Sequence, residues 1–154
     1  LDIFSGSTIN TPSMLAVEDA LAALSWIRES GGSSGTIKRS EANLSAIKDW
    51  VSASNWIEFL AEDEETISNT SICLKITAEN YQNLDSDSQK TFAKDMCKLL
   101  ADEKIAYDIA SYKDAPSGIR IWGGATIETS DIKILTEWLD WAYAEISNQY
   151  SASN

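Results

Sequence analysis

Apolar residues near the end of the chain recur at the spacing of an amphipathic helix. They follow one another at steps of three, four, three and four positions: Ile132, Leu135, Leu139, Ala142 and Ile146. This spacing places their side chains on one face of a helix, and that face must be covered by another layer of structure. Thr129 or Ser130 is suited to begin this helix as its N-cap residue. The segment therefore predicts a helix that packs on the rest of a folded domain.

Short β-forming stretches and one more helix signal precede it. Four stretches are predicted to be strands: residues 56–60, 70–76, 105–112 and 119–122. Asp85 or Ser86 begins a helix between the second and the third of them. This order predicts an α+β domain, in which two helices pack on one face of a small, mostly antiparallel sheet. The polar tail from Asn148 is expected to fray.

Two further helices are expected before the first strand. Thr11 is suited to be the N-cap of the first, with Pro12 at the first helical position, and the pair Gly31 and Gly32 ends it. Thr36 is suited to begin the second. These helices stand outside the strand and helix repeat, and the first resembles a helix that leads in from another domain.

The chain is strongly acidic, with 24 Asp and Glu residues against 12 Lys and Arg and a net charge of −12. This charge argues against a protein that grips nucleic-acid phosphates and against a polybasic membrane-binding segment. No apolar run approaches the roughly 18 residues that a membrane helix needs. The absence of His removes Ser-His-Asp and Cys-His catalysis and, with only Cys73 and Cys97 present, leaves no metal site. We expect both cysteines to be buried and reduced, as in a cytoplasmic protein.

Two segments carry chemistry that the fold alone does not require. The helix start at residues 10–13 (Asn-Thr-Pro-Ser) combines an amide, a hydroxyl and free N–H groups, which suit an anion such as phosphate. A plain N-cap is the alternative. Arg120 lies in an apolar strand and shares a strand face with Trp122. Its guanidinium can hold a carboxylate in two parallel hydrogen bonds, or it can form a cross-strand ion pair with an acid of the chain itself.

Three stretches together closely resemble the C-terminal part of the phosphoserine aminotransferase family: residues 7–19 (STINTPSMLAVED), 69–75 (NTSICLK) and 107–141. The resemblance implies the small domain of a fold-type I aminotransferase, with pyridoxal 5'-phosphate as cofactor, in a cytoplasmic homodimer. The implied reaction, a step of serine biosynthesis, converts 3-phosphohydroxypyruvate and glutamate to O-phosphoserine and 2-oxoglutarate. The family's large N-terminal domain, with the lysine that forms the Schiff base, has no counterpart in this sequence. We therefore expect the chain, which opens with Leu1 rather than Met, to be part of a longer enzyme and to be inactive alone.

The resemblance also implies roles for individual residues. Asn10 and Thr11 match an Asn-Thr pair that reaches across the dimer to the cofactor phosphate of the neighbouring subunit. Arg120 matches the arginine that holds the substrate α-carboxylate. Lys113 stands where better-known bacterial members carry a His, followed by an Arg, that help to bind the substrate phosphate. Because Asp114 follows it here, one phosphate contact is kept and the second is lost.

These roles divide the chain into two parts. Residues 1–16 are expected to contact the cofactor and to begin the first helix, and residues 17–154 to form the small domain that binds the substrate carboxylate. The large cofactor-binding domain is absent.

Two alternatives stay open. One is a non-catalytic α+β module that binds a small acidic metabolite or a protein partner. The other is the small domain of a serine–glyoxylate-type aminotransferase, which the Asn-Thr-Pro-Ser and Gly-Ile-Arg-Ile-Trp-Gly-Gly stretches match less well.

Overall fold

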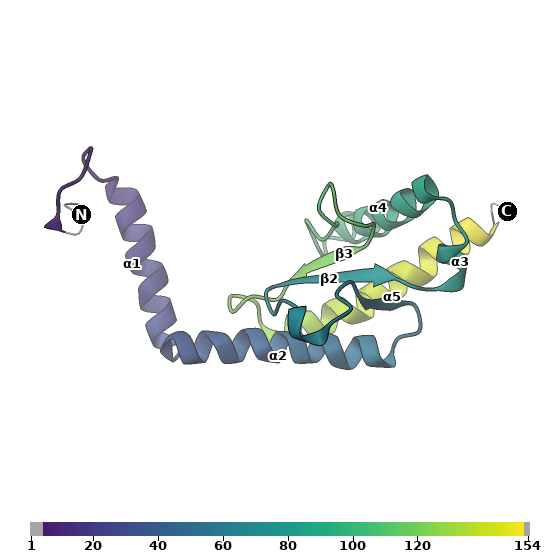
Figure 1. The fold of residues 1–154 in the computed structure, drawn as a ribbon, viewed down its shortest axis with the longest axis horizontal. Helices are drawn as coiled ribbons and strands as arrows, with labels where there is room; N and C mark the ends of the chain where they lie inside the picture. Colours follow the sequence, from purple (N-terminus) through teal and green to yellow (C-terminus); the bar gives the residue numbers. More distant parts are fainter. Residues whose placement is uncertain (1–4, 153–154) are drawn as a thin grey trace. The chain divides into compact units, whose positions relative to one another are not determined.

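The structure, a computed structural model, describes residues 5–152. The chain divides into two compact units, Leu1–Ile37 and Lys38–Asn154. The first unit holds helix α1 (Met14–Glu29) and the beginning of helix α2 (Gly32–Ala53) (Figure 1). The second holds the rest of α2, a three-stranded sheet and the remaining helices.

Helix α1 begins later than the sequence predicts. Its N-cap is Ser13, whose Oγ accepts a hydrogen bond from the N–H of Ala16 at 3.4 Å. The prediction of Thr11 as the N-cap is therefore wrong, and Pro12 lies before the helix rather than at its first position. Both serine and threonine suit an N-cap, and here the hydroxyl that reaches the first turn belongs to the serine.

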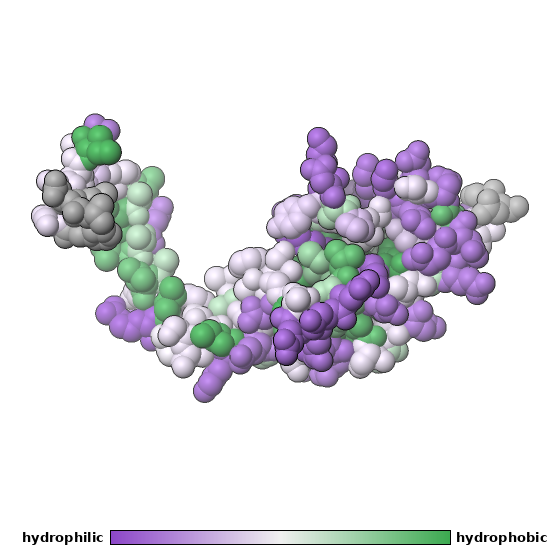
Figure 2. Space-filling model, viewed as in Figure 1, coloured by the Kyte–Doolittle hydropathy of each residue, from purple (hydrophilic) through white to green (hydrophobic). Residues whose placement is uncertain are grey.

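The apolar side chains of α1 are exposed. No residue of this helix is buried. The exposed apolar residues are Met14, Leu15, Val17, Leu21, Leu24 and Trp26. Figure 2 shows hydrophobic surface gathered along this helix. A helix with such a surface is stable only when another layer covers it.

A tight turn joins α1 to α2. Gly31 and Gly32 both adopt left-handed backbone conformations, with φ of +92° and +69°. Helix α2 begins at Gly32, so the prediction that Thr36 begins it is wrong; the Thr36 hydroxyl bonds back to a carbonyl of the preceding turn. The turn is close enough that a Cβ at Gly35 would lie 1.8 Å from the carbonyl oxygen of Ser30.

The sheet of the second unit has the order β1 (Ile57–Phe59), β2 (Ser71–Ile76) and β3 (Ile119–Trp122), and both pairs are antiparallel. In the register of β2 and β3, Ile72 faces Ile121 and Leu74 faces Ile119. These four side chains are buried, whereas their neighbours on the other face of the sheet are not. One face of the sheet therefore belongs to the core.

Three helices complete this unit: α3 (Glu79–Gln82), α4 (Ser86–Asp102) and α5 (Thr129–Ala152). Helices α4 and α5 lie side by side (Figure 1). The core residues that they contribute are Phe92, Met96 and Leu100 from α4, and Ile132, Leu139, Ala142 and Ile146 from α5. The predicted α+β fold and the start of α4, which Asp85 caps, are confirmed.

Two predicted details are wrong. Residues 105–112 do not form a strand: the segment is a loop held to the edge of β3 by one bridge, between Ala110 and Ile119. Asp108, with φ of +54°, interrupts its extended backbone. The tail does not fray at Asn148, because α5 continues to Ala152. Near its end, the Tyr150 ring packs at 5.1 Å from that of Phe92.

Among residues 5–152, no helix is long and apolar enough to cross a bilayer. The same residues contain no group of three or more His, Cys, Asp or Glu placed to hold a metal ion. Cys73 and Cys97 are free, and both are half-buried rather than buried. Burial raises the pKa of the Cys97 thiol to about 11.

Candidate carboxylate-binding site around Arg120

Arg120 lies in the middle of β3, at the edge of the sheet. Its backbone N–H donates to the carbonyl of Ile109 at 2.8 Å, which ties the loop of residues 105–110 to the strand. Ile119 and Ile121 point into the core, and Arg120 and Trp122 lie on the other face. The predicted shared face of Arg120 and Trp122 is therefore confirmed.

The Arg120 guanidinium is held by the loop beside it. Its Nη2 donates to two oxygens of Asp108, the backbone carbonyl at 3.1 Å and the carboxylate Oδ2 at 3.2 Å. The ring of Tyr112 lies 4.5 Å from Arg120 Cζ, within the range of a cation–π contact. The acid that pairs with Arg120 thus comes from the adjoining loop and not from a neighbouring strand.

The two side chains of this ion pair differ strongly in solvent exposure. The side chain of Arg120 is 14% exposed, whereas that of Asp108 is 92% exposed. Water competes strongly for an exposed carboxylate, so the pair adds little to stability. Asp108 is positioned for the contact by its left-handed backbone, which Asp tolerates better than most residues do.

One donor of Arg120 is not used. Its Nε is buried and has no hydrogen-bond partner among the described residues. Burying a donor without a partner is unfavourable by about 1–3 kcal/mol. A carboxylate ligand is an acceptor that would satisfy it, and the site therefore fits such a ligand chemically.

The guanidinium lines a cavity of about 270 Å³. Its wall includes Asp108, Tyr107, Trp122 and Asp131, together with apolar side chains from α5 and the loop of residues 105–109. A cavity of this size takes a ligand of about ten heavy atoms, since an apolar cavity of about 150 Å³ already holds benzene. Arg120 is the cation of this wall and Asp108 and Asp131 are its carboxylates, so an acid would bind through the arginine.

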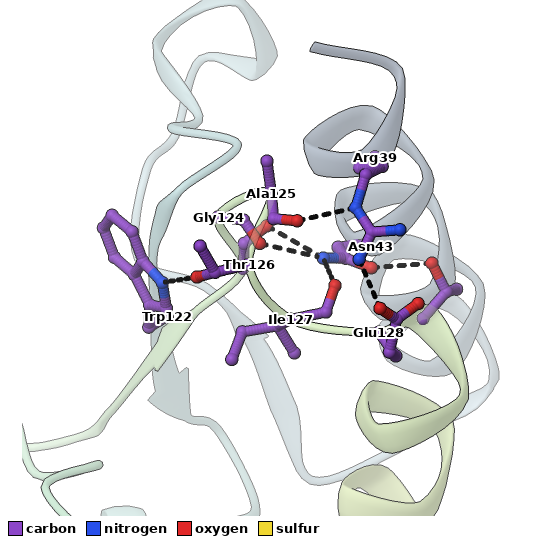
Figure 3. Close-up of polar contacts among 10 residues, drawn as sticks. Arg39, Asn43, Trp122, Gly124, Ala125, Thr126, Ile127 and Glu128 are labelled. Atoms are coloured by element: carbon purple, nitrogen blue, oxygen red, sulfur yellow. Dashed lines mark hydrogen bonds and ion pairs between the residues drawn. The ribbon is translucent and has the colours of Figure 1, made fainter. Parts of the chain in front are cut away.

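The loop after β3 fixes the position of Trp122. The Trp122 Nε1 donates to the hydroxyl of Thr126 at 3.4 Å (Figure 3). The indole also lies against Gly124, where a Cβ would be only 2.4 Å from the ring. The Gly-Gly pair after the strand therefore permits a close approach that no other residue allows at Gly124.

Asn43 of α2 anchors this loop from the other side. Its side chain is fully buried, and its Nδ2 donates to the carbonyls of Gly123, Gly124 and Ile127 at 3.1, 3.3 and 3.0 Å. Its Oδ1 accepts a hydrogen bond from the Thr129 hydroxyl at 2.7 Å. Figure 3 shows Asn43 facing the loop, with its amide at the centre of these contacts.

Arg39, one helical turn before Asn43, adds to the same anchor. Its Nε donates to the carbonyl of Ala125 at 2.6 Å, and it pairs with Glu128. Sequence reasoning did not identify Asn43, Arg39 or Asp108. A polar residue four positions before the buried Ile47 was the only signal available for Asn43.

Lys113 lies at a second cavity, of about 220 Å³. Lys90 and Lys94 of α4 line it as well, and no carboxylate does so among the residues that the structure describes. Tyr112 also lines this cavity, while its ring lies over Arg120. The structure therefore places Lys113 and Arg120 at different cavities, and Tyr112 lines the first while its ring contacts Arg120.

Asn10 and Thr11 belong to the first unit, where both are exposed. They precede the N-cap of α1, whose first turn contains no acidic residue. Amide and hydroxyl donors beside the positive end of a helix fit a phosphate group, and no carboxylate in that turn would repel it.

No protein-family model matches the chain. Two curated relatives match nearly all of it. A phosphoserine aminotransferase of Methanosarcina mazei is 50% identical over 142 residues, which cover 92% of this chain and 36% of the relative. One of Methanosarcina barkeri is 50% identical over 141 residues, covering 92% of this chain and 35% of the relative. The chain thus spans about a third of the length of these relatives.

Solved structures show the same fold. The phosphoserine aminotransferase from Bacillus circulans subsp. alkalophilus matches 94% of this chain with a TM-score of 0.75, at 16% sequence identity, and the match covers 36% of that protein. A phosphoserine aminotransferase studied for radiation damage of its Schiff base matches with the same TM-score, identity and coverage. The resemblance to phosphoserine aminotransferases and the α+β fold are confirmed.

Proposed function

We propose that this chain is the C-terminal part of a phosphoserine aminotransferase and supplies the arginine that holds the substrate α-carboxylate. The identity of 50% over 92% of the chain supports the family. The observation that carries the site is Arg120, whose guanidinium lines a cavity and whose buried Nε has no partner among residues 5–152. The proposed reaction, in serine biosynthesis, converts 3-phosphohydroxypyruvate and glutamate to O-phosphoserine and 2-oxoglutarate. All four compounds carry the carboxylate that Arg120 is proposed to bind.

Arg120 acts by orientation. A carboxylate held in two parallel hydrogen bonds fixes the plane of an amino-acid substrate and so the direction of its Cα–H bond. Trp122 bounds the same cavity and limits the room beside the guanidinium. When bound, pyridoxal 5'-phosphate supplies the electron sink for removal of the Cα proton. We assign the lysine that accepts this proton to the large domain, for which this sequence has no counterpart.

Asn10 and Thr11 are proposed to hold the cofactor phosphate of the neighbouring subunit in a cytoplasmic homodimer. Their exposure and the acid-free first turn of α1 support this assignment. Residues 1–16 would then serve the partner's cofactor, and residues 17–154 would form the small domain. The exposed apolar residues of α1 support a longer, dimeric protein, because they need a surface to cover them.

Lys113 is proposed to contact the substrate phosphate. The cavity beside it supports this role, since Lys90 and Lys94 make it locally positive in a chain whose net charge is −12. A phosphate group there would meet lysine ammonium groups in place of the His and Arg that the better-known members carry.

The test uses the full-length protein that contains this chain. Arg120→Leu should lower kcat/KM for both glutamate and phosphoserine at least about 100-fold, because it removes a charge-assisted bidentate contact. Arg120→Lys keeps the charge without the two-pronged geometry and should lose less. Lys98→Leu, which removes an exposed cation from α4, is the matched control and should leave both substrates unaffected. Unchanged kinetics in Arg120→Leu would make the arginine a structural residue.

A non-catalytic module that binds a small acidic metabolite is the second candidate. It is favoured by the second unit, which has its own buried core and cavities lined by Arg120 and by lysines. Such a module would bind carboxylates without any cofactor, and the full-length protein would exchange no amino group between glutamate and phosphohydroxypyruvate.

A further inference from the structure

We propose that Asp108 is a positioning residue that sets the affinity of Arg120 for carboxylates, by occupying the nitrogen that a bidentate ligand needs. The proposal rests on the proposed function of Arg120 as a carboxylate-binding residue. It adds a residue that neither the fold nor the resemblance singles out.

The geometry of the guanidinium identifies the contested atom. A carboxylate can be held in two parallel hydrogen bonds at either of two edges, Nε with Nη2 or Nη1 with Nη2. Nη2 is common to both edges. Asp108 places two acceptors on this nitrogen, its carbonyl at 3.1 Å and its carboxylate at 3.2 Å. A bidentate ligand must therefore displace one of them.

The carboxylate of Asp108 is the acceptor that leaves. Its side chain is 92% exposed, so water solvates the carboxylate once its hydrogen bond to Arg120 breaks. The carbonyl belongs to a backbone segment that the hydrogen bond between Ile109 and Arg120 ties to β3 at 2.8 Å. The incoming ligand replaces one negative charge by another, and the guanidinium is never left without a counter-charge.

The Nε with Nη2 edge is where we place the ligand. Nε is the donor with no partner in the described part of the chain, and a ligand oxygen there would satisfy it. The Tyr112 ring at 4.5 Å holds the guanidinium plane while the acceptors exchange. Asp108 thus keeps Arg120 oriented between turnovers and competes with every carboxylate that arrives.

Asp108→Asn tests the competition. The substitution keeps the backbone carbonyl and removes only the charge, and Asn tolerates the left-handed backbone as Asp does. Asp108→Gly, which also accepts this conformation, removes the side-chain acceptor altogether. Asp49→Asn is the matched control, because Asp49 is an exposed residue of α2 that lines neither cavity and loses the same charge.

The readout is the ¹⁵N–¹H signal of the arginine Nε groups, titrated with sodium glutarate. The chain has only three arginines, so the signal of Arg120 can be assigned by its loss in Arg120→Lys. An exposed ion pair contributes little, and we expect the apparent Kd for glutarate to fall about three- to fivefold in Asp108→Asn and Asp108→Gly. Asp49→Asn should stay within about twofold of the parent chain, since screening weakens the effect of an exposed charge outside the cavity.

Three results would overturn the proposal: an unchanged or higher Kd in both Asp108 variants, an equal fall in Asp49→Asn, or no shift of the Arg120 signal in any variant. Amino-group exchange by the full-length protein is measured separately. If Asp108→Asn binds glutarate more tightly but the full-length protein exchanges no amino group, the proposed function is wrong and the role of Asp108 still holds.

Discussion

Asn43→Asp exchanges an amide NH2 for an oxygen at a buried position without changing the shape of the side chain. In the native protein, Nδ2 donates to the carbonyls of Gly123, Gly124 and Ile127. An NH2 group has two hydrogens, so the substitution removes two good hydrogen bonds. The new carboxylate oxygen, which is an acceptor, then faces the three carbonyl oxygens. At about 1–3 kcal/mol for each buried group left unsatisfied, the loss is about 2–6 kcal/mol before the buried charge is counted. A domain of this size has only about 5–15 kcal/mol to lose.

The loss should depend on pH. Burial and the facing carbonyls disfavour the charged form, so the introduced carboxyl has a folded-state pKa raised above its unfolded value of about 3.9. The variant is therefore least destabilised, relative to the parent chain, below that unfolded value. It loses stability as the pH rises through the raised folded-state pKa. When protonated, the carboxyl is neutral and can donate one hydrogen bond to a loop carbonyl.

Urea unfolding at pH 7 and pH 4.5 measures the effect. Near-ultraviolet circular dichroism follows the core through the stacked pair of Trp56 and Tyr143, whose rings are 4.3 Å apart. Asn80→Asp is the matched control, because Asn80 is exposed and its Oδ1 only accepts, from the Tyr143 hydroxyl at 2.9 Å. The control should stay within about 0.5 kcal/mol of the parent chain. A loss below about 1 kcal/mol for Asn43→Asp at pH 7, or a loss that is the same at both pH values, would refute the reasoning.

Other substitutions test separate features. Gly124→Ala should displace the Trp122 indole, because the new methyl group would lie 2.4 Å from the ring. We expect a changed NMR signal of the Trp122 indole N–H and a raised KM of the full-length protein for both amino-acid substrates. Cys97 should react with iodoacetamide very slowly at pH 8 and faster as the pH rises toward 11, because its raised pKa leaves about 0.1% thiolate at pH 8; rapid reaction at pH 8 would contradict its burial. Leu24→Glu should reduce self-association of the isolated chain in sedimentation, because Leu24 belongs to the exposed apolar surface of α1. Lys38→Gln, which makes the net charge more negative by the same amount at an exposed position, is the charge control.

The elements with strong periodicity were predictable from the sequence. The apolar repeat of α5 and the alternation in β2 and β3 reflect which side chains face the core, and the core is the largest stabilising term. Residues 105–112 have the composition of a strand, but the left-handed backbone of Asp108 interrupts the extended conformation. No local sequence pattern predicts that backbone conformation. The last turns of α5 were not predicted either, because the contact that Tyr150 makes there is with Phe92, which is far away in sequence.

The candidate site was only partly predictable. The alternation of β3 placed Arg120 and Trp122 on one face, and the structure agrees. The partners of Arg120 could not be foreseen, because Asp108 and Tyr112 reach it through the path of a loop rather than through strand pairing. The role of Asn43 could not be predicted for a similar reason, since its side chain donates to carbonyls about 80 positions later in the chain.

The loop of residues 105–110 has one more effect, on the rim of the sheet. A bare outer strand offers unpaired N–H and C=O groups, which other chains can join to build aggregates. Here the bridge between Ala110 and Ile119 and the hydrogen bond from Arg120 N–H to the Ile109 carbonyl cover part of the outer edge of β3. The segment beside the guanidinium therefore also shields one edge of the sheet, and loosening it would expose strand groups to other chains as well as disturb ligand binding.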